Sequence, residues 1–99
     1  MLFVLMGHDS ANAPELRRQF LSAHLEWVVG VMEHIRVAGP VADEQGQPCM
    51  SLYIVDSATE SEARALIETD PYFRCGVWRE LIVRPFVAAA GTWVGGANW

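Results

Sequence analysis

Two polar side chains on otherwise apolar helical faces are the residues best placed to do chemistry. His24 lies four residues after Phe20 and four before Val28, so it falls on the apolar face of a predicted helix. Asp70 lies four residues after Leu66 and continues the apolar face of a second predicted helix. An imidazole facing a carboxylate is an arrangement that general acid–base catalysis uses. We therefore predict that His24 and Asp70 form a catalytic pair.

Each residue of this pair also has a purely structural interpretation. A buried histidine is commonly satisfied by hydrogen bonds to backbone groups or hydroxyls. Asp70 precedes Pro71, and this order is typical of a helix N-cap followed by proline in the first turn. Because a carboxylate has two oxygens, one aspartate can cap a helix and orient an imidazole at the same time.

Four further residues are candidates for contact with a small molecule near this pair. Ser51, in a predicted strand, is a hydrogen-bonding candidate, since no nucleophile motif surrounds it. Tyr72 and Trp27 can form aromatic walls for a ring-shaped substrate. His8 is expected in a loop at the carboxyl end of the first strand, where functional residues concentrate. The remaining histidine, His34, lies near the predicted end of the first helix and receives no functional role.

Other enzyme and metal-site patterns are absent from the sequence. We find no GxGxxG, P-loop, HExxH or GxSxG pattern. The histidines are separated and no cysteine or carboxylate joins them at ligand spacing, so we expect no metal and no other cofactor. All seven basic residues are arginines, which excludes a Schiff base on lysine. Cys49 and Cys75 form no CxxC pair, and we expect both to be buried, reduced thiols.

Composition limits the classes of protein to which the chain can belong. Its 99 residues make one domain, and 52% of them are hydrophobic. The net charge of −5 argues against binding to a nucleic-acid backbone. The apolar start "MLFVLM" is too short for a membrane span or a signal peptide, so we expect a cytoplasmic protein with no membrane partner.

The hydrophobic pattern predicts the order strand, helix, strand, strand, helix, strand. The strands are expected at 1–6, 35–41, 49–56 and 76–86, and the helices at about 13–34 and 59–70. Asn12 with Glu15, and Thr59 with Glu62, resemble capping boxes at the two helix starts. This order predicts a ferredoxin-like α+β fold, in which two helices cover one face of a four-stranded antiparallel sheet.

Apolar residues on both faces of the predicted sheet indicate self-association. The strands at 1–6 and 49–56 are apolar on both faces, whereas a sheet face that meets water should be polar. We therefore predict a dimeric α+β barrel in which the sheets of two copies face each other, with a homodimer or a larger homo-oligomer as the result. Residues 1–99 are taken as a single domain whose Gly- and Trp-rich extension, 87–99, packs on a partner subunit.

Four segments in the expected order make the sequence similar to the YciI-like family. They are "HLEWV" in the first helix, "AGPV" at the end of the second strand, "SLYIV" in the third strand, and "DPYFRCGVW" followed by "IVRPF". The resemblance spans residues 1–86 and implies a ferredoxin-like dimeric α+β barrel. It also implies an active-site His/Asp pair, which falls on His24 and Asp70. Members often carry an arginine three residues before this histidine, where the present chain has Leu21.

The resemblance and the residues together favour a small acid–base enzyme. The family implies lyase or dehydrohalogenase chemistry on ring compounds, and relatives of the same fold include isomerases of the muconolactone type. His24 would be the general acid or base, and Asp70 would orient its ring. One alternative is a non-catalytic domain that binds or senses a small molecule, and another is a haem-binding barrel with a histidine as axial ligand, because fold alone does not give function.

Overall fold

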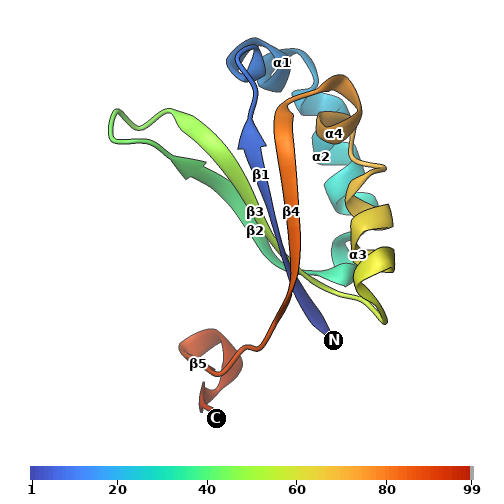
Figure 1. The fold of residues 1–99 in the computed structure, drawn as a ribbon, viewed down its shortest axis with the longest axis vertical. Helices are drawn as coiled ribbons and strands as arrows, with labels where there is room; N and C mark the ends of the chain where they lie inside the picture. Colours follow the sequence, from blue (N-terminus) through green and yellow to red (C-terminus); the bar gives the residue numbers. More distant parts are fainter. Residues whose placement is uncertain (99) are drawn as a thin grey trace.

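The computed structural model describes residues 1–98 and places a layer of helices on one face of an antiparallel sheet (Figure 1). Its strands are β1 (Leu2–Asp9), β2 (Ile35–Ala42), β3 (Pro48–Asp56), β4 (Trp78–Phe86), β5 (Ala90–Gly91) and β6 (Gly96–Ala97). Its helices are α1 (Ala13–Gln19), α2 (Leu21–Gly30), α3 (Glu60–Ile67) and α4 (Pro71–Cys75), with the 3₁₀ turns η1 (Met32–His34) and η2 (Thr92–Val94). This order confirms the predicted βαββαβ plan. The helix predicted over 13–34 is divided into α1, α2 and η1, and the helix predicted over 59–70 corresponds to α3, which is followed by the separate short helix α4.

The sheet has the strand order β2-β3-β1-β4, and each neighbouring pair is antiparallel. Both crossover connections carry their helices to the same face, as the right-handed rule for such connections requires (Figure 1). The predicted ferredoxin-like α+β fold is therefore correct. The two central strands, β1 and β3, lie under the helices and position the residues of the candidate site.

Strand alternation decides which side chains reach the helices. Phe3 and Leu5 of β1 and Tyr53 and Val55 of β3 are buried beneath the helical layer. The same core contains Ala63 and Ile67 of α3, together with Ala13, Tyr72, Val77, Trp78 and Val83. Leu66, on the predicted apolar face of the second helix, is partly buried against this core.

The predicted helix over 13–34 does not run unbroken, because a tertiary hydrogen bond interrupts it. The Tyr72 hydroxyl donates to the carbonyl oxygen of Arg17 at 2.9 Å. In a continuous helix that carbonyl would accept from the amide of Leu21. The chain instead ends α1 at Gln19 and begins α2 at Leu21, with Phe20 between them. The second helix ends at Gly30, and His34 follows in η1.

The helix caps agree with the sequence in two of three cases. The Thr59 hydroxyl accepts from the amide of Glu62 and caps α3. Asp70 caps α4, with Pro71 at its first position. Asn12 makes no side-chain cap, because its backbone lies near φ −95° and ψ 6° rather than in the extended conformation of a cap. The prediction for Asn12 was therefore wrong.

The second face of the sheet is left uncovered by the helices, and the chain's end extends beyond it (Figure 1). Val4 and Met6 of β1 and Leu52 and Ile54 of β3 point to this face by strand alternation. The residues after Phe86 leave the sheet and form the small β5–β6 hairpin, where the Trp93 side chain is 84% exposed. The predicted contact of the 87–99 extension with a partner stays a prediction, and Trp99 lies outside the described residues.

The two thiols differ from the sequence expectation. Cys49 is exposed near the start of β3, and Cys75 is only partly buried at the end of α4. Both are free, but neither is the fully buried thiol that the average behaviour of cysteine predicts. Cys49 lies next to the β2–β3 turn, where no helix covers the sheet.

Candidate functional site

His24 and Asp70 are in direct contact between the helices and the sheet. His24 lies in α2, and its Nδ1 is 2.9 Å from Oδ1 and 3.1 Å from Oδ2 of Asp70. The His24 side chain is 14% exposed, whereas that of Asp70 is fully buried. Because a carboxylate accepts hydrogen bonds, this contact places the ring hydrogen of a neutral His24 on Nδ1. The other ring nitrogen, Nε2, has no hydrogen-bond partner among residues 1–98.

Three different donors hold the buried Asp70 carboxylate. The backbone amide of Tyr72 donates to Oδ1 at 2.9 Å, which is the N-cap bond of α4. The Tyr53 hydroxyl donates to Oδ2 at 3.0 Å from the sheet below. Together with His24 Nδ1, these contacts satisfy a side chain that would otherwise be costly to bury. One aspartate thus caps α4 and contacts the His24 ring at the same time, and the catalytic role of the pair stays a prediction.

Both tyrosines near the pair have raised pKa values. Burial, followed by the charge of Asp70 and the hydrogen bond to it, raises the pKa of Tyr53 far above its ordinary value of 10.0. Burial also raises the pKa of Tyr72, with a smaller contribution from Asp70, although the Arg17 guanidinium acts in the opposite direction. Tyr53 therefore keeps its proton and remains a donor to Asp70 at neutral pH.

Aromatic rings fix the plane of the His24 imidazole. Its ring stacks on Tyr72 with centroids 3.9 Å apart and an interplanar angle of 2°. On its own helix, Trp27 lies 6.2 Å from the His24 ring centroid at 22°. Trp27 is itself fixed by the bond that its Nε1 donates to the Thr69 hydroxyl at 2.7 Å. With one nitrogen held by Asp70 and one face held by Tyr72, the imidazole has little freedom to rotate.

A second polar cluster, which the sequence did not predict, joins Ser51 to Arg17. The Arg17 guanidinium forms a bidentate pair with Asp9, with Nε–Oδ2 at 3.0 Å and Nη2–Oδ1 at 2.7 Å. Arg17 Nη2 also donates to Ser51 Oγ at 3.0 Å, and Trp78 Nε1 donates to the same oxygen at 3.2 Å. Ser51 is buried, as expected for a residue of β3 that faces the helices.

A cavity of about 220 Å³ brings the two clusters together. It is lined by His24, Tyr53, Tyr72, Arg17 and Ser51, and by the apolar or small residues Leu25, Val28, Ala38, Gly39 and Pro40. This volume is below the range of about 300–1,000 Å³ that holds drug-sized ligands. Of the predicted contact residues, Ser51 and Tyr72 line it, whereas Trp27 lies beside His24 without lining it.

His8 is not part of this arrangement. It lies within β1 rather than in a loop, where it pairs with Met50 and Glu80 of the neighbouring strands. The neighbouring Gly7 faces the helices, with the Trp78 ring above it, so alternation turns His8 to the uncovered face. The prediction of His8 in a loop beside the pair was wrong, because β1 continues to Asp9.

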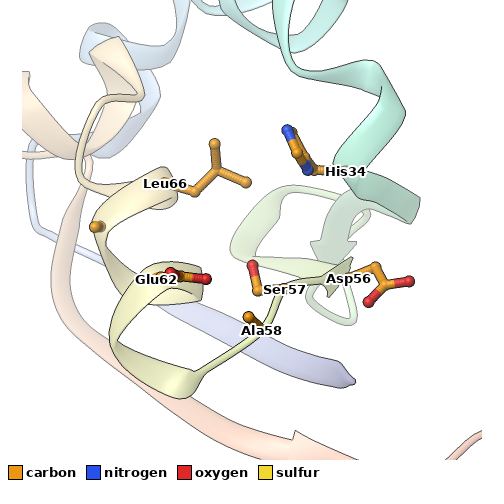
Figure 2. A pocket seen from close by; sticks show the side chains of 7 residues that line it. His34, Asp56, Ser57, Ala58, Glu62 and Leu66 are labelled. Carbon is orange, nitrogen blue, oxygen red and sulfur yellow. The ribbon is translucent and has the colours of Figure 1, made fainter.

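A larger cavity lies at the opposite end of the helical layer, between η1 and α3 (Figure 2). It has a volume of about 590 Å³ and is lined by His34, Asp56, Ser57, Ala58, Glu62, Ala65 and Leu66. The Asp56 carboxylate bonds to Arg36 at 2.6 Å, and His34 lies 3.5 Å from Glu33. None of the residues predicted for the site lines this cavity. The predicted residues His24, Ser51 and Tyr72 line the smaller cavity instead.

Two other features bear on the class of site. Within residues 1–98, no group of three or more histidine, cysteine, aspartate or glutamate side chains could hold a metal ion. None of the helices in this part of the chain has the length and apolar character needed to cross a membrane. The polar side chains that line the small cavity are those of Arg17, His24, Ser51, Tyr53 and Tyr72.

The fold and the paired helices define a ferredoxin-like α+β domain that carries a buried His–Asp contact. A family model described as the YCII-related domain matches residues 1–87. The chain therefore belongs to the YCII-related domain family. The extension after residue 87 lies beyond the part that the family shares.

Solved structures with the same fold include proteins from two bacteria. One is 5-chloro-2-hydroxyhydroquinone dehydrochlorinase, TftG, from Burkholderia phenoliruptrix AC1100, in complex with 2,5-dihydroxybenzoquinone. It is 23% identical, with 93% of this chain and 97% of that chain covered and a TM-score of 0.79. Another is Rv0793 from Mycobacterium tuberculosis, 12% identical, with coverage of 91% and 97% and a TM-score of 0.50. Among curated proteins, none matches this chain. These likenesses show the fold.

Proposed function

We propose that the protein is an acid–base enzyme that transfers a proton on a small, ring-shaped metabolite, with His24 as the base. The observation that carries this proposal is the contact of His24 Nδ1 with the buried Asp70 carboxylate at 2.9 Å. It leaves Nε2 as the nitrogen available to a molecule in the adjoining cavity. Asp70 acts as a positioning residue, because it fixes the tautomer and the ring orientation without touching the substrate.

The proposed reaction begins when Nε2 takes a proton from the substrate. The electron pair of the broken bond forms a new double bond within the substrate. In a lyase, a leaving group on the neighbouring atom departs with its own bonding pair; in an isomerase, the imidazolium returns the proton at another position. The Asp70 carboxylate stabilises the imidazolium in either case. Both outcomes balance without an oxidant, a metal or a cofactor.

The cavity and the solved neighbour support the proposed substrate class. The cavity of about 220 Å³ has an aromatic wall, Tyr72, and apolar sides at Leu25 and Val28. These surfaces suit a planar ring. TftG, which has the same fold, is a dehydrochlorinase solved with a dihydroxybenzoquinone. Chlorinated or hydroxylated rings are therefore the first compounds to test, with dehydrohalogenation and ring isomerisation as the reactions.

The test is turnover of a panel of hydroxylated and chlorinated hydroquinones by the full chain. Chloride release and product absorbance are measured for wild type, His24→Gln and the matched control His34→Gln. Loss of a general base lowers the rate by about 10²–10⁴, so we expect that loss in His24→Gln alone. His34 lies in η1 outside the cavity, and its replacement should leave the rate unchanged.

Two results would contradict the proposal. Turnover that survives in His24→Gln would remove His24 from the chemistry. Saturable binding of the panel without any turnover would instead identify a small-molecule-binding or sensor domain, the alternative reading of the same cavity. An absorbance titration with haem addresses the remaining alternative, and no haem spectrum is expected because the cavity beside His24, at about 220 Å³, is too small for the macrocycle.

A further inference from the structure

We propose that Ser51 and Arg17 form a hydrogen-bond donor pole that binds an anionic or carbonyl oxygen of the substrate. This inference rests on the proposed function and narrows its substrate class. The proposal gives a substrate-binding role to Arg17, for which no prediction was made from the sequence. It also specifies that Ser51 donates its hydroxyl hydrogen to the substrate.

The Ser51 hydroxyl has both of its acceptor positions occupied. A serine hydroxyl offers one O–H donor and two lone pairs. Arg17 Nη2 and Trp78 Nε1 both donate to Ser51 Oγ, at 3.0 and 3.2 Å. Neither a guanidinium nor an indole nitrogen can accept a hydrogen bond in return. Within residues 1–98 no group accepts the Ser51 O–H, and Ser51 lines the cavity. The hydroxyl hydrogen is therefore left to point at a ligand.

The Arg17 guanidinium is also only partly used. Asp9 holds Nε and Nη2, which fixes the plane of the group, and the Tyr72 hydroxyl anchors the Arg17 carbonyl. The two N–H groups on Nη1 have no partner in the described part of the chain. The Arg17 side chain is 13% exposed and lines the cavity. A rigid, charged donor is thus presented to the same space as the Ser51 hydroxyl.

His24 provides the opposite chemistry in the same cavity. Its Nε2 accepts a proton, whereas Ser51 and Arg17 can only donate hydrogen bonds to a ligand. Removal of a proton by the base leaves negative charge, and fixed donors stabilise that charge where it develops on an oxygen. The substrate class is therefore a small enolisable or phenolic ring with an acceptor oxygen at the Ser51 end. A ligand with only donor or apolar groups at that end would leave the pole unpaired.

Binding measurements separate this pole from the catalytic pair. The probes are 2,5-dihydroxybenzoquinone, whose enolic oxygens are ionised at neutral pH, and hydroquinone, a neutral ring of similar size. Calorimetry gives the Kd of each for wild type, Ser51→Ala and the matched control Ser57→Ala. A hydrogen bond to a charged group is expected to change affinity by about tenfold or more. We expect that loss for dihydroxybenzoquinone in Ser51→Ala, a smaller loss for hydroquinone, and wild-type affinities in Ser57→Ala, which lines the other cavity.

Ser51→Cys tests the same contact if Ser51→Ala unfolds. A thiol is a weaker donor, so its affinity for dihydroxybenzoquinone should lie well below that of wild type. The visible absorption band of the bound quinone should also shift in wild type and lose that shift in both variants. A merely structural serine would weaken both ligands equally and leave the shift in place.

Three results would overturn the inference. The first is that wild type shows no saturable binding of dihydroxybenzoquinone. The second is that Ser51→Ala binds dihydroxybenzoquinone as tightly as wild type does. The third is that Ser51→Ala loses the same affinity for dihydroxybenzoquinone and for hydroquinone. His24→Gln serves to separate the two proposals, since it should keep the Ser51-dependent preference for dihydroxybenzoquinone while losing turnover. If His24→Gln retains turnover, the proposed base is wrong and the donor pole still stands on the binding data.

Discussion

The imidazole of His24 lies flat against the phenol ring of Tyr72, with ring centroids 3.9 Å apart and planes within 2° of parallel. The same tyrosine donates from its hydroxyl to the Arg17 carbonyl and from its amide to the Asp70 carboxylate. Tyr72 therefore connects the His–Asp contact to the break between α1 and α2. The Tyr72 ring thus orients the proposed base, His24, and also forms one wall of the cavity.

Substitution of Tyr72 separates its stacking from its hydroxyl. Tyr72→Phe keeps the ring against His24 and loses the bond to Arg17, so unfolding free energy should fall by about 1 kcal/mol with turnover near that of wild type. Tyr72→Leu removes the stack, and a misplaced base should lower turnover by about 10- to 100-fold. Urea unfolding and initial rates measure the two effects. Equal rates for the two variants would show that the stack does not orient His24.

Gly7 is needed because the Trp78 ring occupies the place of a side chain. A Cβ at Gly7 would lie 2.6 Å from two ring atoms of Trp78. Gly7→Ala should therefore lower unfolding free energy by about 1–3 kcal/mol and displace the Trp78 nitrogen from Ser51. Gly30→Ala is the matched control, because nothing lies within 4 Å of its added Cβ. Denaturant unfolding followed by tryptophan fluorescence measures both, and an unaffected Gly7→Ala would contradict the packing described.

The two tyrosines should titrate abnormally in the folded protein. Burial raises the pKa of both Tyr53 and Tyr72, and they are the only tyrosines of the chain. We expect little tyrosinate absorbance near 295 nm at about pH 10, where unfolded tyrosines are half ionised. A raised folded pKa gives stability that is complete below the unfolded value and is lost as pH rises towards the folded value. Unfolding free energy should thus decrease above about pH 10.

Tyr53→Phe provides the check on this titration. The variant lacks the more strongly shifted phenol and should lose less stability between neutral and alkaline pH than wild type, although it starts lower because Asp70 loses a donor. Two tyrosines that ionise near pH 10 while the fold persists would show that neither is buried against Asp70.

The uncovered sheet face and the terminal extension predict an oligomer. Strand alternation places Met6, Leu52 and Ile54 on a face without helices, and Trp93 is 84% exposed on the β5–β6 hairpin. We expect a homodimer or a larger assembly by light scattering, and weaker assembly or a lower Tm after deletion of 91–99. A folded monomer at micromolar concentration would refute the sheet-to-sheet arrangement, and an unchanged Tm and mass after deletion would refute the role of the extension.

Most of the fold was predictable because it follows from local patterns. The hydrophobic pattern of the strands and helices predicted the order of the elements, and the adjacent residues Asp70 and Pro71 predicted the cap of α4. Contacts made across the fold were not readable in the same way. The Tyr72 hydroxyl donates to the Arg17 carbonyl and interrupts the predicted helix. Helix propensity depends on neighbouring residues, so it could not predict a hydrogen bond from a residue 55 positions away.

The sequence indicated the proximity of His24 and Asp70 and two of the residues that line the cavity, Ser51 and Tyr72, but it gave no prediction for Arg17 or Tyr53. His24 and Asp70 were found because each is a polar residue on an apolar helical face. Arg17 precedes His24 by seven residues, two helical turns, so the same spacing argument contained a signal for it. Tyr53 shares the strand face of Ser51 two residues away, which also places it under the helices. The prediction for His8 was wrong because the first strand was expected to end at residue 6, whereas β1 continues to Asp9.

The tautomer of His24 is the most direct test of the central claim, which is that Asp70 holds Nδ1 and leaves Nε2 free to take a proton. The measurement is the ¹⁵N NMR spectrum of the imidazole at about pH 9, where histidine is ordinarily neutral. We predict a protonated Nδ1 and an unprotonated Nε2 in wild type, and the reverse in Asp70→Asn, whose amide can donate to Nδ1. A wild-type ring with its hydrogen on Nε2, or a tautomer that Asp70→Asn leaves unchanged, would contradict the account.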